Sequence, residues 1–214
     1  MSNSRRLLQG FVSPALPSAE QEYSPSFFNR FNGILRLYFN KIDNLIASLL
    51  DINGGALINS PYGAFYTNAV QTLSAANTIT TVTLSTTQGA NGMTLASNKI
   101  TFALDGIYSV MYNLQTANSN AGIQDATVWL RKNGTDIPNS AYLFTLTEKH
   151  GATDGRHDHM ANFGFVATAG DYIELMWAAT STGVSLYYEA AQTVPYAHPS
   201  VPSAYVTVTF ISAV

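Results

Sequence analysis

A seven-residue repeat of apolar side chains between residues 28 and 49 constrains the fold of this chain more than any other feature. Apolar residues recur at alternating steps of three and four, and the register does not slip. This spacing places them on one stripe of an α-helix and is the a/d pattern of a coiled coil. We therefore predict a coiled-coil stalk whose contacts between subunits are Phe28, Phe31, Leu35, Tyr38, Ile42, Leu45 and Leu49.

Signals on either side of the repeat place the helix at residues 24–53. Ser24 suits the N-cap and Pro25 the first helical position, while Gly54 and Gly55 follow the expected end. A single amphipathic helix that lies on the rest of the protein is the alternative interpretation. A wide apolar stripe is consistent with a coiled coil of three or more helices, or with one helix packed on a folded domain. Four further apolar side chains widen the stripe here: Phe27, Ile34, Phe39 and Ile46.

Residues 1–23 show neither helical nor strand periodicity and contain Pro14 and Pro17, so we predict an extended arm. The arm carries apolar side chains, but proline interrupts it too often for it to fold alone. We expect it to become ordered on another protein. Arg5 and Arg6 faintly resemble a twin-arginine signal, but the apolar run behind them is short and broken.

The helical period disappears in the rest of the chain. A linker is expected at 54–61 and a β domain at 62–214, where short β-branched and aromatic runs alternate with turn residues. Asn133-Gly134 predicts a type I′ hairpin turn, and Gly170-Asp171 predicts another tight turn. The pattern favours a mainly β, two-sheet antiparallel jelly roll, with strands near 62–72, 78–85, 98–104, 106–116, 125–132, 136–147, 157–167, 171–179, 184–191 and 204–213.

Several stretches of the β domain resemble a known family. Residues 99–102 (KITF) lead into 105–108 (DGIY), 128–134 read VWLRKNG, 169–175 read AGDYIEL, and 202–208 read PSAYVTV. In this order they resemble the jelly rolls of complement globular heads and tumour-necrosis-factor-like proteins, particularly the versions found in viral proteins. The resemblance covers residues 62–214 and implies a homotrimer, because that family packs three jelly rolls around a threefold axis. Residues 23–30 (YSPSFFNR) are separately similar to N-terminal segments of small phage structural proteins.

Side-chain alternation along the last two long strands predicts which residues approach the threefold axis of the head. Tyr172 and Met176 are expected to face neighbouring subunits, and Tyr205 is expected to do so on the final strand. Tyr172 and Tyr205 are therefore the predicted trimer contacts of the head. The side chains between them are expected to fill the sandwich: Ile173, Leu175, Trp177, Val206, Val208 and Phe210.

The composition narrows the classes of function. Charged residues make up 11% of the chain and the formal net charge is −3, which argues against nucleic-acid binding. No apolar run reaches the roughly 18 residues that span a bilayer, so no membrane insertion is expected. Cysteine is absent, and no nucleophile-elbow, zinc-protease or phosphate-loop motif occurs. We expect no enzymatic activity and no cofactor.

Two short motifs have both a functional and a structural interpretation. His157-Asp158-His159 on a strand would point both imidazoles to one face, where three subunits could offer six nitrogens to a metal at the axis. An exposed polar edge explains the same residues, so we expect no metal and name His157 and His159 only as candidates. Asn133-Gly134-Thr135 matches the N-glycosylation sequon, but the hairpin turn accounts for it.

Counting strand directions back from the C-terminus places the connections 131–136, 168–171 and 192–203 at one end of the head. We expect this end to contact a host surface receptor or glycan, because rigid loops with aromatic and cationic groups lose little entropy on binding. The predicted contact residues are Arg131, Lys132, Tyr196 and His198.

These features together favour a trimeric virion structural protein of a tailed phage, of tail-fibre or knob type. It would be held by other virion proteins through residues 1–23, assembled in the host cytoplasm and carried outside in the particle. One alternative is a capsid head fibre or decoration protein with no receptor role. Another is a secreted, complement-head-like trimeric ligand or lectin. A glycan-cleaving tailspike is disfavoured, because β-helix repeats and a carboxylate cluster are absent from the sequence.

Overall fold

The computed structural model describes residues 14–16, 18, 24–50 and 60–214. The chain divides into two compact units, Met1–Asn59 and Ser60–Val214. The first contains a single described helix, and the second contains every described strand. Most of the predicted arm and linker lie outside the described residues, as does the side chain of Leu49.

Helix α1 (Pro25–Leu50) begins where the sequence predicts. The backbone N–H of Phe27 donates to the Ser24 hydroxyl at 3.3 Å, and that of Phe28 donates to the Ser24 carbonyl at 3.2 Å. These bonds satisfy donors that the first helical turn leaves without partners, and they confirm Ser24 as the N-cap. The predicted helix end near residue 53 lies outside the described residues.

The side chains of α1 form no buried core within the described part of the chain. None between residues 24 and 47 is buried, and the exposed fractions of Leu37 and Phe39 are 65% and 56%. The rings of Phe27 and Phe31 stack at 6.2 Å with planes 12° apart, as side chains four residues apart on one helix face can do. Across the described residues, no helix is both long and apolar enough to cross a bilayer.

The Ser60–Val214 unit consists of two seven-stranded antiparallel sheets, named here after their central strands. The β7 sheet contains β1 (Tyr62–Thr67), β2 (Gln71–Thr72), β4 (Thr86–Asn91), β7 (Gly106–Asn118), β11 (Gly155–Ala167), β13 (Val184–Leu186) and β14 (Ala204–Ser212). The β12 sheet contains β3 (Thr80–Thr81), β5 (Met93–Ala96), β6 (Lys99–Phe102), β8 (Gln124–Lys132), β9 (Thr135–Asp136), β10 (Tyr142–Leu146) and β12 (Tyr172–Ala179).

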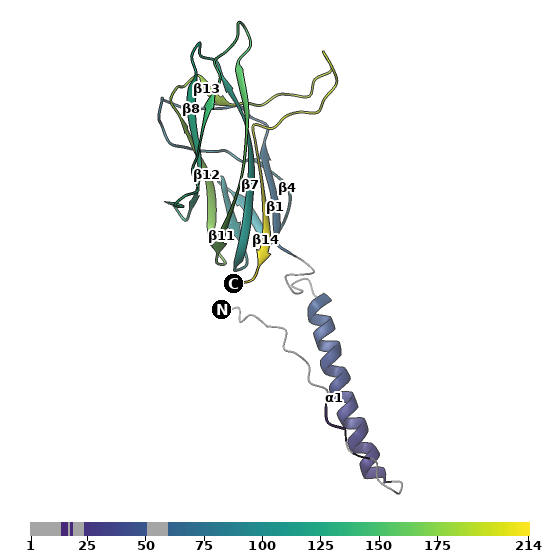
Figure 1. The fold of residues 1–214 in the computed structure, drawn as a ribbon. Coiled ribbons are helices and arrows are strands. Elements are labelled where there is room, and N and C mark those ends of the chain that lie inside the picture. The colour runs from purple at the N-terminus through teal and green to yellow at the C-terminus, as the bar shows by residue number, and fades with distance from the viewer. Residues whose placement is uncertain (1–13, 17, 19–23, 51–59) are drawn as a thin grey trace. The chain divides into compact units, whose positions relative to one another are not determined.

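The longer strands are shared between the two sheets in an interleaved order. The β7 sheet runs β4-β1-β14-β7-β11, and the β12 sheet runs β5-β6-β12-β8-β10. The chain therefore crosses repeatedly from one sheet to the other, as in a pair of Greek keys. This confirms the prediction of a mainly β, two-sheet antiparallel sandwich of jelly-roll type (Figure 1).

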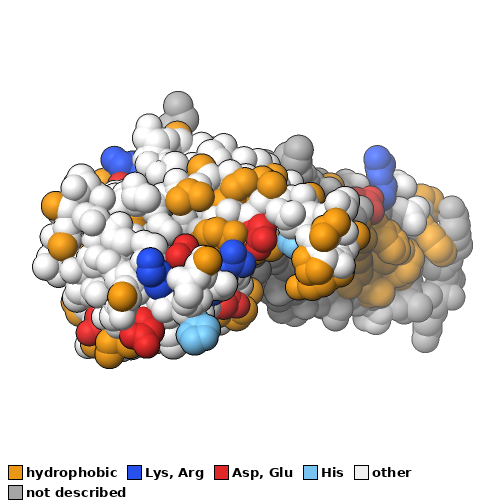
Figure 2. Space-filling model, turned by 90° about the horizontal axis from the view of Figure 1, so that it is seen from above, with side chains coloured by type: hydrophobic (Ala, Val, Ile, Leu, Met, Phe, Trp, Pro, Cys, Tyr) orange, Lys and Arg blue, Asp and Glu red, His pale blue; other side chains and the backbone are white. Residues whose placement is uncertain are grey.

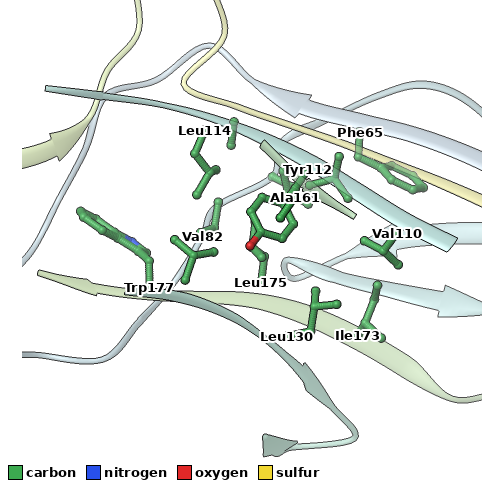
Figure 3. Packing of buried hydrophobic residues seen from close by; sticks show 14 of the residues in the cluster. Phe65, Val82, Val110, Tyr112, Leu114, Leu130, Ala161, Ile173, Leu175 and Trp177 are labelled. Atoms are coloured by element: carbon green, nitrogen blue, oxygen red, sulfur yellow. The ribbon is translucent and has the colours of Figure 1, made fainter. Parts of the chain in front are cut away.

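The core lies between the two sheets and follows the two-residue alternation of the strands. On β7, Tyr108, Val110, Tyr112 and Leu114 are at most 1% exposed, while the residues between them face outward. Side chains from both sheets interdigitate around Tyr112 (Figure 3). The predicted core residues of the last two long strands are buried or packed against the core: Ile173, Leu175, Trp177, Val206, Val208 and Phe210.

Both predicted tight turns are present. Asn133 and Gly134 have φ angles of 50° and 80°, and Lys132 pairs with Thr135, as expected for a two-residue type I′ hairpin. Gly170, at φ 91°, lies in the turn between β11 and β12. These turns form because local sequence alone specifies the positive φ angles that they need.

Several strand predictions need correction. Only the two residues of β3 lie in the strand expected at 78–85, and the one expected at 136–147 is divided into β9 and β10. Residues 86–96 were not expected to form strands, yet β4 and β5 lie there and Gly92, at φ 66°, separates them. Their polar, glycine-containing sequence has low β propensity, and pairing with β1 and β6 overrides it. The strand expected at 62–72 is divided into β1 and β2, and the one expected at 184–191 is only the three residues of β13.

The strand pairings define two ends of the sandwich. At the basal end, β1 begins beside the end of β14, and Gly106 pairs with Ala167. At the opposite end, called the far end, Asn118 pairs with Gly155 and with Val184. Because β13 is so short, the chain stays at the far end between the end of β12 and the start of β14.

Gly155 at the far end provides a test of this packing. A Cβ atom there would overlap the carbonyl oxygen of Thr147 and lie 2.8 Å from that of Glu148. We expect Gly155→Ala to lower the free energy of unfolding by about 1–3 kcal/mol, the usual cost of overpacking. Denaturant unfolding followed by tryptophan fluorescence measures the free energy of unfolding of the sandwich, because Trp129 and Trp177 both lie in it.

The matched control is Gly164→Ala on the same strand. Apart from its own chain neighbours, the nearest atom to a Cβ atom at that position would be the Tyr108 carbonyl oxygen, 3.9 Å away. We expect the control to change stability by less than about 0.5 kcal/mol. Equal effects of the two substitutions would contradict the close backbone approach at Gly155.

Candidate functional site

The four predicted host-contact residues do not share one end of the sandwich. Ile173, near the start of β12, pairs with Lys132, so Arg131 and Lys132 lie at the basal end. Tyr196 and His198 lie in the connection before β14, at the far end. The predicted common patch was wrong because residues 184–191 were counted as a full-length strand. Without that crossing, the expected directions of β8, β11 and β12 are reversed.

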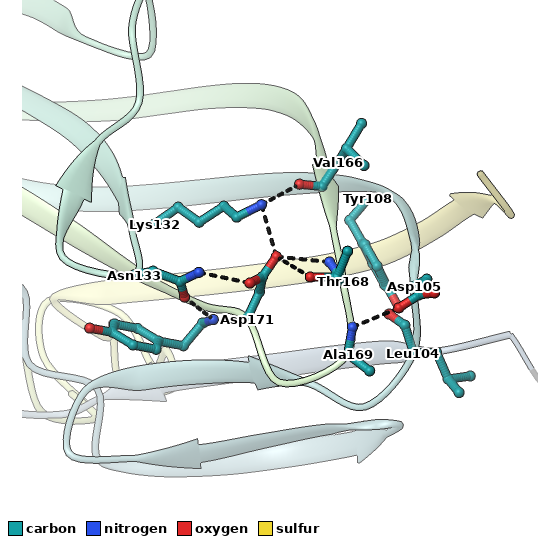
Figure 4. Close-up of polar contacts among 10 residues, drawn as sticks. Leu104, Asp105, Tyr108, Lys132, Asn133, Val166, Thr168, Ala169 and Asp171 are labelled. Carbon is teal, nitrogen blue, oxygen red and sulfur yellow. Dashed lines mark hydrogen bonds and ion pairs between the residues drawn. The ribbon is translucent and has the colours of Figure 1, made fainter. Parts of the chain in front are cut away.

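Lys132 belongs to a polar network that holds two turns together at the basal end (Figure 4). Its Nζ atom lies 2.8 Å from Asp171 Oδ2 and donates to the Val166 carbonyl at 2.9 Å. Asp171 also accepts bonds from the Thr168 backbone and hydroxyl and from the Asn133 side chain. Burial acts to raise the pKa of Asp171, but these donors hold it well below its usual range. The network is structural.

The same network explains the sequon at Asn133. Its amide nitrogen donates to Asp171 at 2.7 Å, and its amide oxygen accepts the Tyr172 N–H at 2.9 Å. Both ends of the side chain are therefore used by the turn. This supports the structural interpretation of Asn133-Gly134-Thr135.

Arg131 is also engaged within the chain. Its Nε atom and the Trp129 indole nitrogen both donate to Asp136 Oδ1 at 2.8 Å. The Arg131 bond, followed by that of Trp129, lowers the pKa of Asp136. A carboxylate thus balances each of the two predicted receptor cations. Neither cation is available as an isolated positive charge.

The two predicted trimer tyrosines lie on opposite outer faces of the sandwich. Tyr172 projects from the β12 sheet, where the Lys99 ammonium lies 4.3 Å from its ring centroid. Tyr205 projects from the β7 sheet and stacks on Tyr66 at 6.1 Å. Met176 was expected to face a neighbouring subunit, but it is only 3% exposed, and the Thr81 hydroxyl contacts its sulfur. That expectation was wrong because β3 covers this part of β12.

The outer face of the β7 sheet is uncharged over most of its width. Strands β1, β4, β7 and β14 contain no Asp, Glu, Lys or Arg, and the outward charges of the sheet are Arg156 and Asp158 on β11. The outer face of the β12 sheet carries Lys99, Arg131 and Glu174. In space-filling view the charged side chains are few and lie among apolar and uncharged polar surface (Figure 2).

Exposed apolar side chains are also found on this β7-sheet face. Met111 and Met160 are 43% and 58% exposed, and cross-strand pairing places Met160, Asn113, Tyr205 and Tyr66 in one row across four strands. Uncharged surfaces with exposed large apolar groups often mark contacts between proteins. The β7-sheet face is therefore the stronger candidate for contact with another protein, and Tyr205 lies on it.

His157 and His159 point to the same side of β11, as the H-x-H spacing predicts. Both imidazoles stack on Phe144 of β10, with centroid distances of 5.5 and 4.3 Å. They therefore lie where the edge strands β10 and β11 meet, and Tyr142 contacts His159 as well. Within the described residues, no group of three or more His, Cys, Asp or Glu side chains is placed to hold a metal.

His159 has an unusual environment within this aromatic group. Its Nε2 atom and the Tyr112 hydroxyl are both buried without a hydrogen-bond partner, and the two rings are 6.0 Å apart. Burial lowers the pKa of His159 and nearby His157 lowers it further, while Asp158 opposes this shift. Burial also raises the pKa of Tyr112, with a smaller contribution from Tyr142. Both groups therefore stay neutral near pH 7.

Tyr196 and His198 belong to an ordered projection that we call the far-end loop, residues 187–203. Isolated bridges pair Glu189 with Val201 and Gln192 with His198. The rings of Tyr196 and His198 lie 5.6 Å apart, and Tyr196 is 69% exposed. The structure therefore brings Tyr196 and His198 together in one loop, apart from Arg131 and Lys132.

Sequence reasoning missed the residues that hold this loop and those that surround His159. Arg156 contacts Tyr187 and Glu189 across more than thirty residues of sequence. Phe144 meets His159 only because two edge strands lie side by side. Neither contact has a local signal, since both depend on strands that are distant along the chain.

Comparison of the sequence with known protein families gave no match. Comparison with curated proteins also gave none.

The depressed pKa of His159 leads to a prediction about pH. Unfolded histidine has a pKa of about 6.5, whereas folded His159 resists protonation. The unfolded state therefore binds more protons as pH falls below about 6.5, and folded-state stability should decrease there. For one such group, the free energy of unfolding cannot change by more than about 1.4 kcal/mol per pH unit. Thermal unfolding between pH 7.5 and 5 measures it.

His159→Phe should weaken this pH dependence, because phenylalanine can stack on Phe144 without taking up a proton. His150→Gln, at an exposed histidine elsewhere in the sandwich, is the control and should leave the pH dependence unchanged. If His159→Phe has the same pH profile as the unmodified chain, His159 is not responsible.

Proposed function

We propose that this protein is a homotrimeric structural component of a virus particle, of the fibre or decoration type found in tailed phages. In this proposal α1 forms a three-helix stalk, the sandwich forms the head, and residues 1–23 attach the trimer to another virion protein. The resemblance of residues 62–214 to viral jelly rolls, and of residues 23–30 to phage structural proteins, supports this class.

The observation that carries the proposal is the exposed apolar surface of α1. A helix with apolar residues at a and d positions normally buries them against a partner. In α1, the a and d side chains Leu35, Tyr38 and Ile42 are only partly buried, and large residues beside them are exposed. An isolated helix is marginally stable in water, because its stability in proteins comes mainly from packing of the apolar face. Association of several copies supplies that packing.

The head offers a second contact surface. The uncharged outer face of the β7 sheet, with Tyr205 on it, can be covered by another copy without burying charge. Tyr172 is the weaker of the two predicted contacts, because burial of neighbouring Lys99 and Glu174 would cost desolvation free energy. Contacts around a threefold axis join two different patches of each subunit, so both faces remain available.

The host-contact part of the expected function is less well supported. The predicted patch would have combined two cations with two aromatic groups, but the pairs lie at opposite ends of the sandwich. Arg131 and Lys132 are also held in ion pairs at the basal end. We therefore propose a role in assembly and attachment, and we assign no receptor patch to residues 131–136.

The stalk is tested by an acidic residue at a seam position. Leu35→Asp would bury three carboxylates at one layer of the helical bundle, which is strongly unfavourable. We expect light scattering to give three times 23.1 kDa for the unmodified chain and a smaller mass, or a concentration-dependent one, for the variant. Leu37→Asp is the matched control, because Leu37 is 65% exposed and lies off the seam. A monomeric unmodified chain, or equal effects of both variants, would refute the stalk.

The virion assignment is tested by deletion of residues 1–23. We expect the shortened chain to remain a folded trimer, because the deletion ends before the helix cap at Ser24. It should be absent from purified particles produced in cells that express it in place of the full chain. Normal incorporation of the shortened trimer would show that another part of the chain attaches it.

A further inference from the structure

The far-end loop is built as a stiff projection. The backbones of Glu189 and Val201 exchange hydrogen bonds of 3.1 and 2.8 Å, and those of Gln192 and His198 exchange two of 3.1 Å. The Nδ1 atom of His198 is also 2.8 Å from the Pro199 carbonyl oxygen. Three prolines between residues 195 and 202 restrict the backbone further. The loop can therefore present its tip with little loss of entropy on binding.

A side-chain clamp anchors the base of the loop to β11. The guanidinium group of Arg156 lies 4.2 Å from the centroid of the Tyr187 ring, donates to the Tyr187 hydroxyl at 2.7 Å and pairs with Glu189 at 3.2 Å. A planar guanidinium group can make these contacts together, whereas an ammonium group cannot. The clamp holds the loop at a set angle to the sandwich.

The tip of the loop is apolar and open to solvent. Val194 is 77% exposed and Tyr196 is 69% exposed. Residues 193–200 contain no carboxylate, amide, ammonium or guanidinium side chain. Glycans are usually held through several such polar groups, so this composition favours a protein as the partner. An exposed tyrosine beside apolar residues is typical of a contact with another protein.

The loop projects sideways from the sandwich. In Figure 1 it leaves the far end across the direction of the strands, beyond the side formed by β1 and β4, and does not continue along the strands. A partner reached in this direction lies beside the head. In the proposed trimer, that position is occupied by the neighbouring subunit.

We propose that the far-end loop clasps a second copy of this chain, with Tyr196 packed against the neighbouring subunit's β7-sheet face. This inference rests on the proposed trimer. The contact joins two different patches, so three loops can close a ring around a threefold axis. Tyr196 and His198 would then act in assembly.

The charge, the side-chain chemistry and the length of the far-end loop fit a second copy of this chain as its partner. The loop tip contains no Asp, Glu, Lys or Arg, and neither does the part of the receiving face formed by β1, β7 and β14, so a contact centred there buries no unpaired ion of these types. Met111 and Met160 on that face supply flexible thioethers, which pack well against aromatic rings. The seven residue steps from Glu189 to Tyr196 extend at most roughly 23 Å, at about 3.3 Å per step. That distance covers more than four strand spacings of about 4.8 Å.

A photo-crosslinker at the tip tests the proposal in the full-length chain. With p-benzoylphenylalanine in place of Tyr196, illumination of the trimer should join chains covalently, and mass spectrometry should locate the bonds in β7 or β11. Benzophenone reacts readily with methionine, so Met111 and Met160 are the expected targets. The same crosslinker in place of Leu143, which is 72% exposed on β10, is the control and should join no chains at these sites.

A second pair of variants tests the receiving face. Met160→Lys should reduce the crosslink yield from position 196 several-fold, because it places a charge under the apolar tip. Met160→Leu should preserve the yield. Light scattering of each sample establishes whether the trimer is intact.

Two outcomes would overturn the clasp while leaving the proposed trimer intact. One is a trimer in which position 196 forms no bond between chains, including the case in which Tyr196→Ala virions lose adsorption to their host. The other is crosslinking to a segment outside β7 and β11. A monomer by light scattering would refute the proposed function itself, so the two failures are distinguishable.

Discussion

Strand β7 is the element on which the rest of the sandwich depends, because it is paired along both sides. Its thirteen residues pair with β11 on one side and with β14 and then β13 on the other. Its core side chains Tyr108, Val110, Tyr112 and Leu114 are almost completely buried and meet those of the β12 sheet. This double pairing sets the registers of the neighbouring strands. It thereby determines which residues reach the basal end, the far end and the outer face.

The two outer faces of the sandwich differ in how many charged side chains they carry. The ion pairs of Lys132 and Arg131 are used to hold turns at the basal end, while most of the β7-sheet face carries no charge. Desolvation of an ion without a partner is costly, whereas uncharged surface can be covered freely. This face and the apolar stripe of α1 are the surfaces of the described residues best suited to contact with another protein.

One short strand changes the functional interpretation of the head. Because β13 has three residues, the chain between β12 and β14 stays at the far end and has room to form the projecting loop. The same feature separates Arg131 and Lys132 from Tyr196 and His198. Side chains that resemble a single binding patch in a count of strands therefore have different roles, two in turn structure and two on a projection.

Local chemistry made much of this structure predictable from sequence. The seven-residue repeat and Ser24 identified the helix and its start, and Asn133-Gly134 identified the hairpin. Alternation on β12 and β14 identified the core residues Ile173 and Val206. Each of these signals operates within a few residues, where hydrogen bonding and backbone preference are decided by neighbours along the chain.

Only the tertiary structure decided the features that depend on distant pairing. The polar segment 86–91 became a strand because β1 offered it a partner, and Met176 became buried because β3 lies beside it. His159 is shielded from solvent because Phe144, a residue of the other sheet, stacks on its ring. The sequence by itself determined the helix, the two tight turns and the core-facing residues of the long strands β12 and β14. The ends, the faces and the environment of each candidate site were decided by contacts between strands far apart in the chain, and no local pattern encodes these.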